Sequence, residues 1–330
     1  MNGPASMTGM DITAPTVTNS PARHDKAVYM CVDRAFFPYA LFLANQIATA
    51  WPARTFDIVI ASTAPLPEHP LFDALGLRRA VIDIGHLRDK VFVDQRIPLA
   101  AYLRILFPRA LRDDYRRVLY LDADVFYQRG DLPRLLDLDM TGKPVAAVRD
   151  LPQIRKPLRT NVDMETAGEF HFKYLNSGVL LIDTPAYLTA GVDDTAFAHA
   201  RRLGEKLTAH DQSALNLALR GDWLELNPVW NYIYTHQTMY FAGFFDVCFY
   251  HFCGRRKPFK GKYGGFARRF TEPYRRFFTE HWPDALPQMQ DGLQVDRKAW
   301  LHRGVMLFHA ANFRRYMRFE DDWRSDFDTR

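Results

Sequence analysis

Two carboxylates one residue apart, Asp122 and Asp124, follow the apolar run Val118–Leu121. A continuous apolar run bounded by polar residues is typical of a strand that is buried on both faces of a parallel sheet. Ligands of open α/β sheets bind beyond the carboxyl ends of the strands, so we expect both carboxylates at the mouth of such a crevice. Because neighbouring carboxylates raise each other's pKa, the pair indicates a divalent cation such as Mg²⁺ or Mn²⁺ that carries a diphosphate. The alternative is that both residues only form a turn after a strand.

The elements that must position these carboxylates alternate between strands and helices. Strands are predicted at 27–32, 56–61, 80–84, 118–121, 144–148 and 174–183, and helices at 36–51, 100–111, 193–207 and 211–219. This alternation predicts an α/β fold with a parallel sheet and right-handed crossovers. The segment Leu151–Gly168 is polar and irregular, and we expect a loop or a lid there. No G-x-G-x-x-G follows the first strand, which argues against a nicotinamide-binding Rossmann enzyme.

The composition indicates a globular protein of a reducing compartment. The 330 residues allow one large α/β domain or two smaller ones, and 48% hydrophobic residues suffice for a sizeable core. No stretch approaches the ~18 unbroken apolar residues of a membrane span. The three cysteines are an odd number without metal-finger spacing, which favours free thiols and a cytoplasmic location.

The two ends of the chain differ in character from the middle. Residues 1–25 are rich in Thr, Pro, Ala and Ser without an apolar core of signal-peptide type, and we expect a disordered leader outside the fold. The stretch His251–Arg330 holds 17 Lys and Arg against 10 Asp and Glu, a net charge of +7 within a total of +5. Its arginines alternate with aromatic residues, as in Phe266–Phe270 and Phe313–Tyr316. This pattern suits an anionic membrane surface or nucleic acid, or a solvated face whose aromatic rings pack inward.

Four stretches could together form one site. They are Val118–Phe126 with the two carboxylates, Tyr174–Asp183 with Asn-Ser-Gly inside an apolar strand, His210–Asn216, and His251–Pro258. In this order they resemble glycosyltransferase family 8, which includes glycogenin and the bacterial lipopolysaccharide galactosyl- and glucosyltransferases. The resemblance covers Ala27–Phe259 and is strongest toward the lipopolysaccharide branch. It implies a GT-A-type fold with a mostly parallel central sheet flanked by helices, a catalytic domain at 26–262 and a basic, aromatic C-terminal extension at 263–330.

The resemblance also implies a set of donor-binding residues. Asp122, Asp124 and His251 match the metal ligands, and this donor set suits Mn²⁺, with Mg²⁺ as the alternative. The remaining positions that match the donor site are Val32, Asp33, Arg104, Ala123, Gly254 and Lys257. Asp33 is expected to recognise the uracil base, Arg104 the phosphate and sugar, and Lys257 the diphosphate. Without the resemblance, His251 would be interpreted as a hydrogen-bonded core histidine.

A third group of residues matches the sugar pocket. Asn176, Asp211 and Gln212 are implied to bind the transferred sugar, with Gln212 under its anomeric carbon. Since an amide is a poor nucleophile, we favour front-side attack with Gln212 as electrostatic stabiliser, while Asp211 stays open as a nucleophile. Asp150 is expected to face the acceptor. From the residues alone, Asp211 could equally be a helix N-cap and Asn176 part of a bulge.

The expected function is therefore retaining transfer of galactose or glucose from a UDP-sugar to a glycan or a lipid-linked, lipopolysaccharide-like acceptor. We expect the basic tail to bring the enzyme to the inner membrane face, and we expect no nucleic acid partner. One alternative is a magnesium-dependent phosphatase of the haloacid dehalogenase type. Its Asp-x-Asp usually lies near the chain start with Thr or Val two residues on, where this chain has Phe126. The other alternative is an inactive sugar-nucleotide-binding module.

Overall fold

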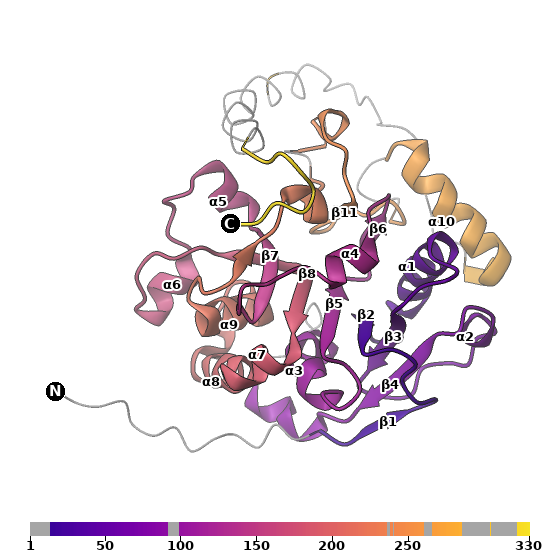
Figure 1. The fold of residues 1–330 in the computed structure, drawn as a ribbon, viewed down its shortest axis with the longest axis horizontal. Helices are drawn as coiled ribbons and strands as arrows, with labels where there is room; N and C mark the ends of the chain where they lie inside the picture. Colours follow the sequence, from indigo (N-terminus) through magenta and orange to yellow (C-terminus); the bar gives the residue numbers. More distant parts are fainter. Residues whose placement is uncertain are drawn as a thin grey trace.

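The computed structural model describes residues 14–91, 99–235, 238–239, 241–260, 266–285, 304 and 322–330. An eight-stranded sheet in the order β1-β4-β3-β2-β5-β8-β7-β9 forms its centre (Figure 1). The strands are β1 (Thr16–Thr18), β2 (Lys26–Cys31), β3 (Asp57–Ser62), β4 (Arg78–Ile82), β5 (Arg117–Leu121), β7 (Val145–Arg149), β8 (Leu175–Asp183) and β9 (Leu224–Glu225). A second sheet in the order β10-β11-β6 consists of β10 (Tyr232–Ile233), β11 (Phe249–His251) and β6 (Val125–Tyr127).

The central sheet has four adjacent parallel strands and includes antiparallel pairs on either side of them. Strands β4, β3, β2 and β5 run parallel, while β8 is antiparallel to both β5 and β7. The insertion of β8 brings the Asn-Ser-Gly segment beside the end of β5. This follows from the register, in which Leu121 pairs with Val179.

Helices cover both faces of the sheet. The α-helices are α1 (Phe37–Ala50), α2 (Leu71–Ala74), α3 (Leu103–Ala110), α4 (Leu132–Leu136), α5 (Leu151–Arg155), α6 (Val162–Ala167), α7 (Thr184–Thr189), α8 (Val192–Leu203), α9 (His210–Leu219) and α10 (Arg268–His281). Alternate residues of β2 belong to two separate hydrophobic clusters, one on each face of the sheet, because successive strand side chains point to opposite faces. Val28 and Met30 pack with α1 and α10, whereas Ala27 and Tyr29 pack with α3 and α8. None of the described helices is long and apolar enough to cross a membrane.

The predicted leader is too long. β1 pairs antiparallel with β4, and Val17 stands opposite Val81, so the fold begins by Thr16 and not after Asp25. The alternation that signals a strand spans only three residues here, which is too short to distinguish from a polar linker. Residues 1–13 lie outside the described residues.

The segment Leu151–Gly168 contains α5 and α6, so the expected irregular loop is wrong. Asn161 caps α6 by accepting a hydrogen bond from the Asp163 backbone N–H at 2.8 Å, and Gly168 ends it in a left-handed conformation. Both helices are short, and their apolar face is correspondingly small, which left no 3.6-residue pattern to recognise.

The described aromatic residues of α10, within the basic tail, pack inward. Phe270, Tyr274, Phe277 and Phe278 of α10 are buried in the same cluster as α1, and the Tyr274 ring stacks on Phe42 with centroids 3.8 Å apart. In Figure 1, α10 lies along α1. These rings are therefore not available to a membrane surface. The motif Phe313–Tyr316 lies outside the described residues.

The end of the chain returns to the central sheet. Arg330 and Glu225 exchange two backbone hydrogen bonds of 2.8 and 3.0 Å, so the last residues extend the edge at β9. Asp326 accepts a hydrogen bond of 2.6 Å from Arg129. The described parts of the C-terminal extension thus share the core of the preceding residues.

Candidate active site

Asp122 and Asp124 form the turn that joins β5 to β6. The backbone N–H of Asp122 donates to the Gly178 carbonyl at 2.9 Å, and that of Phe252 donates to the Asp124 carbonyl at 3.2 Å. The turn is therefore held from two sides, by β8 and by the residue that follows β11. This places both carboxylates beyond the end of a central strand, as the sequence predicts.

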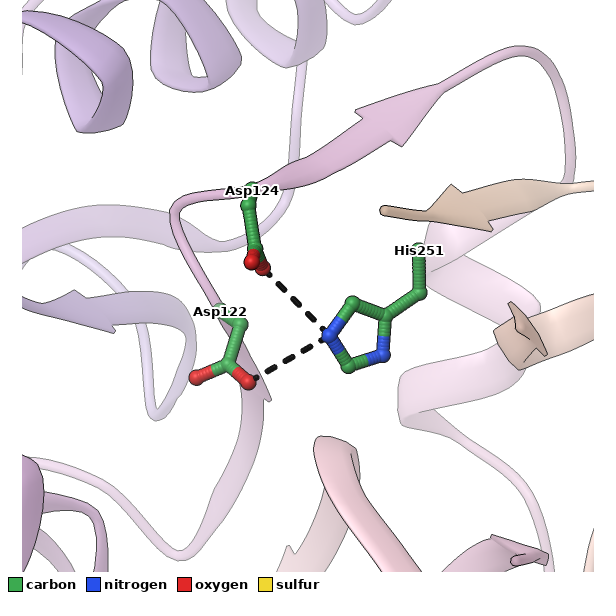
Figure 2. A group of neighbouring side chains, drawn as sticks. All are labelled: Asp122, Asp124 and His251. Carbon is green, nitrogen blue, oxygen red and sulfur yellow. Dashed lines mark ion pairs between the residues drawn. The ribbon is translucent and has the colours of Figure 1, made fainter. Parts of the chain in front are cut away.

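His251 comes from the second sheet. β11 runs antiparallel to β6, and His251 stands opposite Val125. This register aims the imidazole at the turn, with Nε2 3.5 Å from Oδ2 of Asp122 and 3.3 Å from Oδ1 of Asp124 (Figure 2). Gly178 gives the ring its space: a Cβ on this glycine would lie 2.0 Å from Cε1 of His251. The glycine of the Asn-Ser-Gly segment is therefore required by a close side-chain contact.

A chain of three amide and imidazole groups orients His251. The backbone N–H of Gly178 donates to Oδ1 of Asn176 at 3.1 Å, which identifies that atom as the oxygen. Asn231 must then donate through Nδ2 to the same oxygen, at 2.9 Å. Oδ1 of Asn231 is left to accept from Nδ1–H of His251 at 3.0 Å. This assignment of donors and acceptors starts from a backbone N–H, whose role as a donor is fixed. Because Nδ1 of His251 donates to Asn231, Nε2 faces the carboxylates.

These residues fit a divalent metal ion. One ligand atom from each of Asp122, Asp124 and His251 lies within 4.8 Å of the others. Oδ1 of Asp124 is buried and accepts no hydrogen bond from the described residues, so a lone pair is left toward the cluster. Two carboxylates and one imidazole suit Mn²⁺, and a second hydrogen bond to the other ring nitrogen is the usual support of a metal-ligating histidine.

Lys257 lies on the other side of Asp124. Its Nζ contacts Oδ2 of Asp124 and the Phe252 carbonyl, and the side chain is buried. Burial raises the pKa of Asp124, but the charges of Lys257 and His251 more than offset this and hold the pKa below its usual range. Gly254, three residues before Lys257, has φ +78°, a conformation that favours glycine. The ammonium of Lys257 thus compensates the charge of Asp124 beside the cluster.

Arg104 links the acidic turn to α9. Its Nη2 lies 3.0 Å from Oδ1 of Asp122, and its Nε lies 2.9 Å from Oδ2 of Asp211. The same guanidinium donates to the Ser177 hydroxyl at 3.0 Å. Tyr120 donates to Oδ1 of Asp122 at 2.5 Å and lies under the guanidinium. Burial raises the pKa of Asp211, and the charge of Arg104 opposes this rise.

A pocket of about 240 Å³ opens beside these groups. Its lining residues are Cys31, Val32, Asp33, Phe36, Ala100, Ala101, Arg104, Asp122, Ala123, Asp124 and Asp211. Oδ1 of Asp33 accepts a hydrogen bond of 2.9 Å from the Phe36 backbone N–H, at the start of α1. The carboxylate thus closes a turn and still borders the pocket. Most donor-site residues predicted from the sequence meet at this one cavity.

The other predicted residues do not line this pocket. Ser177 N–H donates to Oε1 of Gln212 at 3.0 Å, and Nδ2 of Asn176 donates to Oδ1 of Asp150 at 3.0 Å. Burial raises the pKa of Asp150, while the hydrogen bond from Asn176 lowers it. Gln212, Asn176, Asp150, Gly254, His251 and Lys257 are not among the pocket-lining residues.

The start of α9 is held by a residue that the sequence analysis missed. Asp163 is fully buried and accepts from the Thr208 backbone N–H at 2.7 Å and from the Ser213 hydroxyl at 2.6 Å. The N-cap position of α9 is Ala209, so the prediction that Asp211 could be an N-cap is wrong. His210 has φ +40°, which is strained for a residue with a side chain. α6 therefore positions the helix that carries Asp211 and Gln212.

Asn231 was also missed. It follows Pro228-Val-Trp230, where a single amide in an apolar stretch was the only signal. Its importance depends on the contact with His251, which no local pattern reveals. The three cysteines are free, as expected, and Cys31 borders the pocket.

Comparison of the fold with solved structures identifies the class. The galactosyltransferase LgtC, solved in complex with donor and acceptor sugar analogues, matches with a TM-score of 0.60 at 21% identity over 75% of this chain and 94% of the other. The apo-form glycosyltransferase GlyE of Streptococcus pneumoniae TIGR4 matches with a TM-score of 0.53 at 17% identity over 81% of this chain and 66% of that chain. These likenesses show the fold, which is the GT-A type of glycosyltransferases.

The sequence comparisons then give the family. The model of glycosyl transferase family 8 matches residues 27–262, and the chain belongs to this family. General stress protein A of Bacillus subtilis (strain 168) is 33% identical over 49% of this chain and 59% of its own length. The lipopolysaccharide 1,2-glucosyltransferase of Escherichia coli (strain K12) is 33% identical over 41% of this chain and 39% of its own length. The matches thus span less than two thirds of these relatives. Membership of the family argues against the phosphatase alternative.

Proposed function

We propose that this protein transfers a hexose, glucose or galactose, from a UDP-sugar to a glycan or lipid-linked acceptor with retention of configuration. The observation that carries the proposal is the cluster of Asp122, Asp124 and His251, with Lys257 beside it and a pocket in front. Two relatives named for such transfers support the choice of sugar, the lipopolysaccharide 1,2-glucosyltransferase and the lipopolysaccharide 1,3-galactosyltransferase of Salmonella typhimurium.

The donor is proposed to bind across the pocket. Asp33 accepts the imide N–H of uracil at one end, with Val32 and Ala123 along the wall. Lys257 and the backbone at Gly254 approach the diphosphate at the other end. Arg104 pairs with both Asp122 and Asp211, compensates their negative charges and orients both toward the donor.

The three clustered ligands are proposed to hold Mn²⁺, with Mg²⁺ as the alternative. When bound, such an ion neutralises the negative charge that develops on the leaving nucleoside diphosphate. The protein contributes the orientation of the ligands. Asn231 fixes Nε2 of His251 toward the carboxylates, and Gly178 leaves room for the ring.

Retention is proposed to follow from front-side attack. The Gln212 amide oxygen is held by the Ser177 backbone N–H, so its position beneath the sugar is set before the donor arrives. An amide does not form a stable glycosyl ester, and Gln212 therefore stabilises positive charge on the sugar ring electrostatically. The departing phosphate oxygen takes the proton of the acceptor hydroxyl. Asp211 is engaged by Arg104, which favours a role in binding sugar hydroxyls over that of a nucleophile.

The acceptor is proposed to enter on the side of Asp150 and Asn176, at the end of β7. We propose a cytoplasmic enzyme whose acceptor is presented at the inner membrane face. Within the described part of α10, Arg268 and Arg276 have exposed side chains, each at ion-pair distance from Glu272.

The test is release of UDP from a panel of UDP-sugars with Mn²⁺ or with EDTA. We expect slow, Mn²⁺-dependent release from one sugar, with loss in Asp124→Ala and no change in the control Asp113→Ala, whose side chain is 95% exposed. UDP with Mn²⁺ at a hundredfold excess over its Kd should raise the free energy of unfolding by about 2.7 kcal/mol. The anomeric configuration of the product reports retention.

Two results would contradict the proposal in different ways. Stabilisation by UDP and Mn²⁺ without release from any UDP-sugar, even with acceptor glycans, would identify an inactive sugar-nucleotide-binding module. If UDP and Mn²⁺ do not stabilise the protein and no UDP is released, the UDP-sugar site is excluded altogether.

A further inference from the structure

The largest exposed apolar side chains on the acceptor side belong to the two loops that flank α6. Leu158 is 87% exposed and Phe170 is 88% exposed. The two loops are tied together, because His171 Nε2 lies 2.8 Å from the Pro157 carbonyl and Gln153 donates to both the Arg159 and the Phe172 carbonyls at 3.0 Å. Leu158 and Phe170 therefore project from one supported surface and not from two independent loops.

Three cations adjoin Leu158 in the sequence. Arg155, Lys156 and Arg159 lie in five consecutive residues without an acid, and within the described residues none of the three has a carboxylate partner at salt-bridge distance. Burial and the charge of Arg159 lower the pKa of Arg155, while the charge of Asp150 opposes this. Nε of Arg155 is buried without a hydrogen-bond partner.

Four acids lie near these cations in the sequence, at Asp150, Asp163, Glu165 and Glu169. Asp150 interacts electrostatically with Arg155, and Glu165 is exposed on α6. Asp163 is buried in the hydrogen bonds that hold α9, and Glu169 forms an ion pair with Arg220 at 2.7 Å. We define the α5–α6 surface as Arg155, Lys156, Leu158, Arg159, Phe170 and His171. It combines protruding apolar side chains with unpaired cations, the combination that binds anionic lipid bilayers.

Its position relates it to the active site. α5 starts directly after Asp150, and its five residues span about 7–8 Å at 1.5 Å per residue, so the surface lies close to the acceptor side. α5 and α6 lie at the opposite edge of the molecule from α10 (Figure 1). The two candidate membrane contacts can therefore be distinguished experimentally.

We propose that the α5–α6 surface docks on an anionic phospholipid bilayer, with Leu158 and Phe170 entering the interface and Arg155, Lys156 and Arg159 contacting lipid phosphates. Docking there turns the Asp150 side of the site toward the membrane. The proposal rests on the proposed function for its biological purpose, since it explains how a lipid-linked acceptor reaches the site. The binding itself needs neither donor nor turnover.

The experiment is co-sedimentation of the full-length protein with vesicles of phosphatidylcholine alone or of an equal mixture with phosphatidylglycerol. We expect binding to the mixed vesicles only. Lys156→Ala/Arg159→Ala should reduce the partition coefficient about thirtyfold, since each basic residue contributes about fivefold near an anionic surface. Leu158→Ser/Phe170→Ser should reduce it at least about tenfold through lost apolar burial.

Two matched controls separate this surface from others. Val17→Ser removes an apolar side chain that is 71% exposed on the edge strand β1, and Arg268→Ala/Arg276→Ala removes two exposed cations of α10. Both should bind vesicles like the wild type. Absence of wild-type binding, equal binding to neutral vesicles, or loss of binding only in the α10 variant would each overturn the proposal. UDP release without vesicles should be equal in all these variants, so a failure of docking is distinguishable from a failure of the transferase.

Discussion

Nδ1 of His251 lies 3.0 Å from Oδ1 of Asn231, and this contact decides which imidazole nitrogen faces the two carboxylates. Asn231 is in turn oriented by Asn176, which accepts from the Gly178 backbone and donates to Asp150. The proposed metal side and the proposed acceptor side of the site are thus joined through two buried amides. Fully satisfied buried networks of this kind hold their members in one arrangement.

Replacing Asn231 with Leu should weaken Mn²⁺ binding about 10- to 100-fold, the usual effect of losing the outer partner of a metal-ligating histidine. Asn231→Asp keeps an acceptor for Nδ1–H and should retain most of the affinity. The measurement is Mn²⁺ affinity by titration calorimetry or by the electron paramagnetic resonance signal of free Mn²⁺. Equal affinities for the Leu variant and the wild type would show that Asn231 does not position the ring.

Gly178→Ala should displace His251, because the new Cβ would stand 2.0 Å from Cε1 of the ring. We expect Mn²⁺ affinity to fall more than tenfold and the free energy of unfolding to fall by about 1–3 kcal/mol, as in overpacked cores. The matched control is Gly243→Ala, where the added Cβ meets no atom within 4 Å. Urea unfolding and Mn²⁺ titration check both values. An Ala variant that keeps its metal affinity would contradict the steric argument.

Arg104→Ala should destabilise the fold by about 3 kcal/mol, since Asp122 and Asp211 would be left as uncompensated, largely buried charges. The control Arg112→Ala removes a side chain that is 59% exposed and whose Nε lies 3.8 Å from Oδ1 of Asp113. Because this pair is exposed to solvent, its loss should change the free energy of unfolding by less than about 1 kcal/mol. Urea unfolding without metal measures both. A cost for Arg104→Ala no greater than that of the control would mean that the two carboxylates do not need this partner.

Asp163→Ala should loosen the start of α9. The Thr208 N–H, the Thr208 hydroxyl and the Ser213 hydroxyl would lose their acceptor, at a cost of about 3 kcal/mol. Hydrogen exchange of the α9 amides should rise relative to those of α1. Asp113→Ala, a fully solvated counterpart, should stay within about 0.5 kcal/mol of the wild type. Unchanged exchange at α9 would indicate that α6 does not position this helix.

The local sequence was sufficient for most of the elements and for the carboxylate half of the proposed metal site. A buried strand has a continuous apolar run, and β5 with Asp122 and Asp124 after it is visible in ten residues. Helices with a clear apolar stripe, such as α1 and α8, were predicted close to their observed bounds. The match to family 8 and to GT-A folds confirms the resemblance that the four ordered stretches indicated.

Tertiary structure alone decided the rest, because the relevant contacts join residues that are distant in the chain. The aromatic residues of α10 could face lipid or core on sequence grounds, and only packing against Phe42 shows that they are buried. The space for His251 comes from Gly178, and its orientation comes from Asn231. A glycine or an asparagine carries no local signal of such a partner. The free energy that its contact contributes depends on which atoms the fold brings within reach.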